Sequence, residues 1–124
     1  MEINQITSKI IGCAIEVHKD LGAGLLESAY EECLFYQLIS TTNLKVERQK
    51  AIPLIYKQVE MECAFRADFI IEDKVIVELK SVSEIHPIHK AQLNTYMKLT
   101  NSKVGLLINF NTVLLKNGIH RWII

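Results

Sequence analysis

Hydrophobic positions change their spacing along the chain, and the change divides it into helical and extended parts. Between residues 4 and 21 apolar side chains recur every three or four positions, which predicts an amphipathic helix ending at Gly22-Ala23-Gly24. The same spacing predicts a second helix from about Leu25 to Ser40. From Leu44 the spacing becomes two, which indicates that strands begin there.

The extended part is expected to hold strands over 44–56, 60–71 and 74–82, with Pro53 marking an edge strand or a strand break. His86-Pro87 favours the start of a helix that ends near Thr100, because proline suits the first helical turn.

A continuous apolar run at 104–110 is typical of a strand covered on both faces. The lengths of 74–82, the helix and 104–110 match a crossover unit, so these two strands are expected to be parallel. Asn117-Gly118 predicts a two-residue hairpin between 113–116 and 119–124. The expected fold class is α/β (α+β), a mixed central sheet flanked by helices.

Composition limits the class of protein. A chain of 124 residues, 49% hydrophobic and 23% charged, is long enough for one globular domain, expected to span 1–124. It contains no apolar run long enough to cross a bilayer, so no membrane partner is expected, and no signal peptide is evident at the N-terminus. The odd, widely spaced cysteines Cys13, Cys33 and Cys63 favour a reducing, cytoplasmic location.

Charge is balanced overall but segregated along the chain. The formal net charge is zero, yet all 14 acidic residues lie at or before Glu84, and the last forty residues carry only basic charges. Segregation of this kind suits a protein that needs carboxylates in one place and phosphate contacts in another, although a short chain can also reach it by chance.

The charges of greatest interest interrupt the apolar stretch from Arg66 to Ser81. A three-residue turn at 72–74 places Asp68 opposite Glu78 and leaves Ala67, Phe69, Ile71, Val75, Val77 and Leu79 on a wholly apolar opposite face. Directly opposed carboxylates repel unless a cation lies between them, and Lys80 would share their face. Two interpretations remain open from spacing alone: a Mg²⁺ site that binds a phosphate, or a solvated hairpin face on which Arg66 and Lys80 pair with the acids.

Three sequence features resemble a known family. Asp68, nine further residues and then Glu78-Leu79-Lys80 resemble the signature of the PD-(D/E)XK nuclease superfamily, with Ala67 in place of the usual proline. Gly24-Leu25-Leu26-Glu27-Ser28-Ala29-Tyr30 looks like the G-x-x-E-x-x-Y motif of the GxxExxY family in that superfamily. Gln92-Leu93-Asn94-Thr95-Tyr96 resembles the Q-x-x-x-Y element of RecB-like nucleases.

This resemblance implies a restriction-endonuclease-like core and metal-dependent hydrolysis of phosphodiester bonds. By the resemblance, Asp68, Glu78 and the Leu79 carbonyl would bind Mg²⁺ or Mn²⁺, and Glu27 would add a carboxylate to the metal or hold its water shell. Lys80 would orient or activate the attacking water. Gln92, Tyr96 and Tyr30 are the expected substrate contacts, and DNA is the expected nucleic acid.

Other functions are compatible with the same sequence. A non-catalytic module that binds nucleic acid or another protein could use the same fold. The near-neutral net charge of the chain favours this alternative. A homodimer through a sheet edge or the C-terminal hairpin could accompany either function. Taken singly, Glu27 is also a favourable first-turn carboxylate, and Tyr30 and Tyr96 are residue types that often lie in a core with a hydrogen-bonded hydroxyl.

Overall fold

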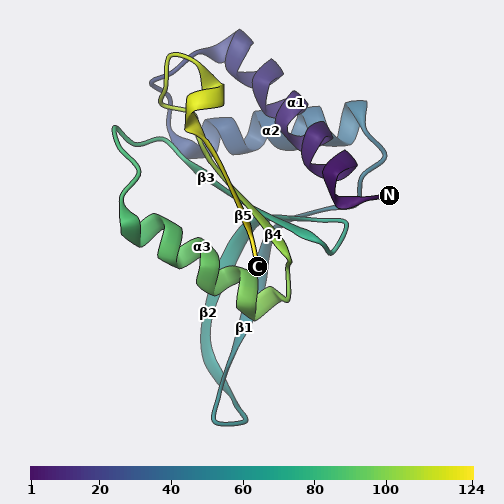
Figure 1. Ribbon diagram of the computed structural model, residues 1–124, viewed down its shortest axis with the longest axis vertical. Helices are drawn as coiled ribbons and strands as arrows, with labels where there is room; N and C mark the ends of the chain where they lie inside the picture. The colour runs from purple at the N-terminus through teal and green to yellow at the C-terminus, as the bar shows by residue number, and fades with distance from the viewer.

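The computed structural model describes the backbone of residues 1–124 and the side chains of all of them except 62–64. The elements, in chain order, are α1 (Ile3–Leu21), α2 (Glu27–Thr41), β1 (Val46–Tyr56), β2 (Val59–Ile71), β3 (Val75–Lys80), α3 (Pro87–Thr100), β4 (Val104–Asn109), the 3₁₀ helix η1 (Leu115–Gly118) and β5 (Ile119–Ile123). The sheet has five strands in the order β1-β2-β3-β4-β5. As predicted, it is mixed, because β3 and β4 are parallel while the other neighbours are antiparallel (Figure 1).

Each helix forms where the apolar spacing predicts it. In α1 the buried positions Ile6, Ile10, Ala14 and Val17 follow one another at three or four residues, so one face of the helix meets the sheet. The helix ends at Gly22, whose φ of 70° is left-handed and whose N–H bonds back to the His18 carbonyl.

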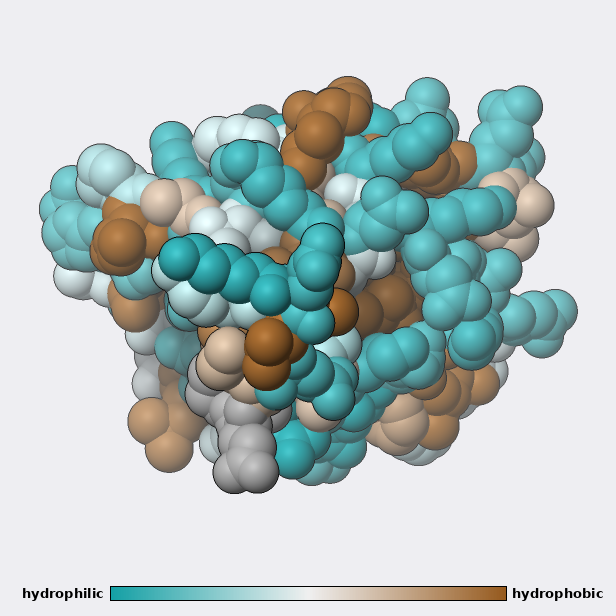
Figure 2. Space-filling model, turned by 90° about the horizontal axis from the view of Figure 1, so that it is seen from below, coloured by the Kyte–Doolittle hydropathy of each residue, from teal (hydrophilic) through white to brown (hydrophobic). Residues whose placement is uncertain are grey.

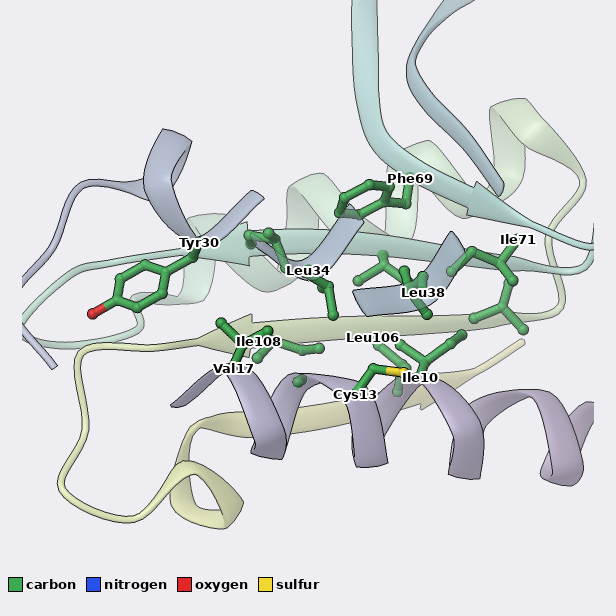
Figure 3. Close-up of a cluster of buried hydrophobic side chains, with 14 of the residues drawn as sticks. Ile10, Cys13, Val17, Tyr30, Leu34, Leu38, Phe69, Ile71, Leu106 and Ile108 are labelled. Atoms are coloured by element: carbon green, nitrogen blue, oxygen red, sulfur yellow. The ribbon is translucent and has the colours of Figure 1, made fainter. Parts of the chain in front are cut away.

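Two hydrophobic clusters hold the helices on opposite faces of the sheet. The larger cluster joins α1 and α2 to the sheet through side chains that include Leu34, Leu38, Phe69 and Leu106 (Figure 3). The smaller cluster joins α3 to the other face and consists of the buried residues Ile52, Ala67, Ile70, Ile76, Leu93, Met97 and Leu107. β4 is buried on both faces as predicted, since it lies between these clusters.

β1 and β2 continue beyond the rest of the sheet as a two-stranded ribbon, which projects from the body in Figure 1. Lys57 and Gln58 form its turn, both with positive φ. Of the two alternatives predicted for Pro53, the edge strand is confirmed and the strand break is not, because β1 is an edge strand that continues through this proline with a register shift directly after it. Figure 2 looks along the molecule from this end and shows hydrophilic and hydrophobic side chains intermixed.

The C-terminal hairpin prediction is wrong. Residues 115–118 form η1, and β5 pairs with β4 rather than with residues 113–116. Gly118 lies against the Asn109 carbonyl, where a Cβ atom would come within 2.1 Å of the oxygen. Glycine is therefore required at this position by a tertiary contact and not by a hairpin turn. The same correction removes that hairpin as a dimer surface.

Across the described residues, none of the helices is both long and apolar enough to span a membrane.

Candidate active site

The predicted hairpin between β2 and β3 is present. Its strands pair in the predicted register, with Phe69 opposite Val77, Ile70 opposite Ile76 and Ile71 opposite Val75. The backbone turns at Glu72 and Asp73, which both have a φ of 55°.

Beyond this short ladder, side chains replace backbone groups as hydrogen-bond acceptors. The Asp68 N–H donates to Glu78 Oε2 at 3.2 Å, and the Leu79 N–H donates to Asp68 Oδ2 at 2.9 Å. Each carboxylate is therefore fixed by a backbone donor on the opposite strand, which keeps the two acids side by side. The prediction that Asp68 and Glu78 lie next to each other on adjacent strands is confirmed.

The apolar face of the hairpin differs from the prediction at one residue. Phe69, Ile71, Val75, Val77 and Leu79 pack into the larger cluster, as predicted, but Ala67 lies in the smaller one with Ile70 and Ile76. The alternation breaks at Asp68, opposite Gln49, whose φ of 50° is left-handed. A positive φ in one strand interrupts the pleat, so the side chains beyond it exchange faces.

Glu78 is an unusually buried acid. Its side chain is only 6% exposed, on the face of β3 that meets α3. Burial, followed by the negative charge of Asp68, raises the pKa of Glu78 to about 9, and Lys80 opposes this change. At neutral pH Glu78 therefore keeps its proton.

Gln49 is also part of this site, although no motif or spacing predicts it. Its amide nitrogen donates to Asp68 Oδ1 at 3.0 Å and also to Glu31 Oε1, which joins a residue of α2 to the hairpin. Glu31 is held in turn by Arg48, with 2.9 Å from Nε to Oε2. The position of Gln49 within the polar run Arg48-Gln49-Lys50 is typical of a solvated strand.

Lys80 lies at the end of β3, two residues after Glu78, and lines an open groove of about 600 Å³ between the hairpin and α3. Gln92 and Tyr96 line the same groove, so three predicted site residues meet there. Gln92 Nε2 donates to the Tyr96 hydroxyl at 3.1 Å, as their spacing of four on one helix allows. Burial and the charge of Glu78 raise the pKa of Tyr96.

Phe65 and His89 also line this groove and were not predicted as site residues. The ring of Phe65 stacks on Tyr96 with 5.1 Å between centroids and 17° between planes. His89 Nδ1 accepts the His86 N–H, and burial and the charge of Lys80 lower the pKa of His89. His89 is therefore neutral at pH 7 and carries its ring proton on Nε2.

Glu27 is placed in the first turn of α2 with an exposed side chain. It lies near enough to His89 to act on the pKa of that residue, on the Lys80 side of the site. Among the described residues, no three His, Cys, Asp or Glu side chains come close enough together to hold a metal ion. The predicted convergence of Glu27 with Asp68 and Glu78 is thus not found.

Tyr30, an expected substrate contact, is fully buried, which agrees with the alternative of a core residue. Its ring stacks on Phe110 at 4.5 Å, and its hydroxyl points out of the apolar cluster (Figure 3). That hydroxyl donates to the Gly22 carbonyl at 2.6 Å and accepts the Leu25 N–H at 3.2 Å. Tyr30 therefore fixes the loop between α1 and α2, and both hydrogen-bonding functions of its hydroxyl are used inside the protein.

Comparison with protein families adds an independent finding to this geometry. A family model described as "PDDEXK_3: PD-(D/E)XK nuclease superfamily" matches residues 4–122. The chain belongs to the PD-(D/E)XK nuclease superfamily. Neither the curated proteins nor the solved structures gave a significant match.

Membership of the PD-(D/E)XK nuclease superfamily agrees with the mixed sheet and its flanking helices, and it suggests nuclease activity in general. The match spans α1 to β5 and so includes both strands of the carboxylate hairpin.

Proposed function

We propose that this protein is a Mg²⁺-dependent nuclease of the GxxExxY group that hydrolyses phosphodiester bonds in DNA. One observation carries the proposal. In a chain of the PD-(D/E)XK superfamily, Asp68 and Glu78 are locked together by backbone donors, and Lys80 follows at the mouth of a groove. We treat residues 1–124 as a single nuclease-like domain.

The donors at the site fit a magnesium ion. Mg²⁺ is usually held by one or two carboxylates and keeps several waters, so it does not need a cage of three acidic side chains. The raised pKa of Glu78 reflects burial beside a second acid, a conflict that a divalent cation relieves. Asp68, Glu78 and the Leu79 carbonyl would hold the ion, which when bound lowers the pKa of water and polarises a phosphoryl oxygen.

The remaining residues act around the scissile phosphate. The Lys80 ammonium group, at the groove, holds the attacking water or offsets the negative charge that develops on the phosphoryl oxygens. Glu27, exposed on the same side as Lys80, is assigned to the water shell of the ion rather than to direct contact with it. Gln92 and Tyr96 bind the substrate strand from α3.

The geometry around Tyr30 supports the GxxExxY assignment. Gly24 has a φ of 99°, which favours glycine, and Tyr30 holds the turn that contains it. Glu27 then begins α2 beside the site. The three named positions of the motif therefore have connected roles, namely a backbone turn, a carboxylate and the hydroxyl that fixes the turn.

We also propose a cytoplasmic location, because Cys13 and Cys33 are free thiols.

The experiment is a digest of plasmid and oligonucleotide DNA with Mg²⁺, Mn²⁺ or excess chelator. Wild type is compared with Asp68→Ala and Lys80→Ala, and Asp73→Ala serves as the matched control because Asp73 is an exposed acid in the turn of the same hairpin. We expect cleavage by wild type and Asp73→Ala in either metal, and a loss of at least about a hundredfold in the other two variants.

Cleavage that survives both site substitutions would overturn the assignment. If wild type binds DNA in a salt-sensitive manner but cuts it in neither metal, the protein is a binding module on a nuclease fold.

A further inference from the structure

The groove beside Lys80 differs in chemistry from a surface that follows a phosphate backbone. α3 presents Ile88, Ala91, Gln92 and Thr95 to it, at spacings of three and four residues, and all four side chains are exposed. None of them is charged, and Ile88, 69% exposed, presents an apolar side chain to solvent there.

Two aromatic side chains also line the groove, Phe65 from β2 and Tyr96 from α3. Phe65 comes from β2, three residues before Asp68, and its ring stacks on Tyr96. Gln92 bonds the Tyr96 hydroxyl and so fixes the position of the pair. Phe65 precedes Asp68 on β2 and Lys80 follows Glu78 on the antiparallel β3, so both lie at the same end of the carboxylate pair and the groove is next to the proposed reaction centre.

Charge limits what this groove can bind. Of the described side chains that line it, Lys80 is the one charged at neutral pH, since His89 is neutral. A stretch of nucleic acid backbone places a negative charge at each nucleotide and is usually matched by several lysines or arginines. One cation beside an apolar and amide surface matches one phosphate and the uncharged base attached to it.

The volume of the groove also suits a single base. A groove of about 600 Å³ lies within the range of clefts that bind small ligands. A base that is paired and stacked inside a duplex has neither face free to contact a side chain, whereas an unpaired base can stack on an aromatic ring.

We propose that this groove binds one unpaired nucleobase of the strand being cut, with the base against Phe65 and Ile88 and its phosphate at Lys80. This inference rests on the proposed nuclease function and specifies its substrate class: single-stranded nucleic acid, or a strand end freed from its partner. Gln92 and Thr95 offer polar groups to the edge of the base.

The experiment measures binding without cleavage. Fluorescence anisotropy compares a short labelled single strand with the blunt duplex of the same sequence, using Asp68→Asn protein with chelator present. DNA and RNA versions of the single strand distinguish the two sources of an unpaired base. We expect the single strand to bind more tightly than the duplex, and Phe65→Leu or Ile88→Ser to weaken single-strand binding by about fivefold or more.

The chain offers a matched control. Ile123 on β5 is 68% exposed, against 69% for Ile88, so Ile123→Ser removes the same amount of exposed apolar surface away from the groove. It should leave both affinities unchanged. Ile88 is exposed, so its substitution tests the groove without disturbing the core, even if Phe65→Leu lowers stability.

Tighter binding to the duplex, equal effects of Ile88→Ser and Ile123→Ser, or no binding to any strand would overturn the proposal. Failure of the base site can be distinguished from failure of the proposed nuclease function. Wild-type cleavage with no effect of Ile88→Ser on binding removes the base site alone. Single-strand binding that depends on Ile88, without cleavage in any metal, removes the nuclease function alone.

Discussion

At the scale of single residues, the proton on Glu78 links the site to stability. Burial, followed by the negative charge of Asp68, raises the pKa of this carboxyl from 4.5 to about 9. Between these values the folded state binds more protons than the unfolded state. The stabilisation is therefore fully present below pH 4.5 and is lost as pH rises toward 9, at a slope of up to about 1.4 kcal/mol per pH unit.

We predict that, in chelator, the free energy of unfolding measured with urea falls between pH 5 and pH 9 relative to Glu78→Gln, in which this proton cannot be lost. Mg²⁺ should reduce the fall, because it replaces the proton between the carboxylates. Parallel pH profiles for wild type and Glu78→Gln would contradict the assignment of the raised pKa to Glu78.

Gln49 provides a second test at this scale, since its amide fixes Asp68 Oδ1 from a left-handed backbone position. We predict that Gln49→Gly, which tolerates the positive φ but removes the amide, lowers kcat by about tenfold or more with little change in KM. Gln49→Asn keeps an amide in a residue that tolerates this backbone and should restore part of the rate.

Gln58 is the control for this experiment. It also has a positive φ, 69°, but it lies at the tip of the ribbon, so Gln58→Gly should leave the rate unchanged. A loss of rate in Gln58→Gly equal to that in Gln49→Gly would show that the effect comes from the backbone and not from the contact with Asp68.

At the scale of elements, Tyr30 ties the α1–α2 loop to the sheet. Leu25, whose N–H bonds to the Tyr30 hydroxyl, accepts a hydrogen bond through its carbonyl from Ser81 Oγ at 2.6 Å. Ser81 directly follows Lys80, so the loop and the end of β3 are connected.

We predict that Tyr30→Phe lowers the free energy of unfolding by about 1–3 kcal/mol, because the Gly22 carbonyl and Leu25 N–H lose a buried partner. Tyr36→Phe on the same helix is the control: Tyr36 is 67% exposed, and the change should stay within about 0.5 kcal/mol. Urea unfolding of both variants measures this, and equal effects would refute the structural role of the Tyr30 hydroxyl.

The elements also show what the sequence could and could not predict. Helices α1, α2 and α3 and the parallel pair β3–β4 follow from periodicity, proline and run length, which are local signals. Asn117-Gly118 failed as a hairpin signal because Gly118 is required by its close contact with the carbonyl of Asn109, nine residues earlier at the end of β4. No spacing rule records such a contact.

In the candidate site, too, local patterns predicted some residues and missed those that depend on tertiary contacts. Asp68 and Glu78 meet because strand register is fixed by the apolar face of the hairpin. Gln49 bonds Asp68, and links Glu31 to it, from a position where the backbone of β1 is left-handed. No pattern in the sequence of β1 predicts this backbone conformation. Tyr30 was chosen from a motif, and the motif does not distinguish a substrate contact from a buried anchor.

At the scale of the whole molecule, the segregation of acidic residues along the chain also separates them in the fold. All acidic residues lie at or before Glu84, so α3, β4 and β5 contain none, while the carboxylate hairpin lies in the acidic part of the chain. The groove lies between Lys80 of the hairpin and α3, where the acidic part meets the acid-free part. A substrate phosphate can thus approach from α3 without passing acidic side chains of that helix.

The proposed nuclease activity depends on a divalent-metal centre formed by Asp68 and Glu78. The most direct measurement is anomalous diffraction from crystals soaked in Mn²⁺, which substitutes for Mg²⁺ at oxygen-ligand sites. We predict a peak between the Asp68 and Glu78 carboxylates, beside the Leu79 carbonyl, that disappears in Glu78→Gln crystals soaked in the same way. An anomalous map with Mn²⁺ bound elsewhere on the protein and none at this pair would contradict it.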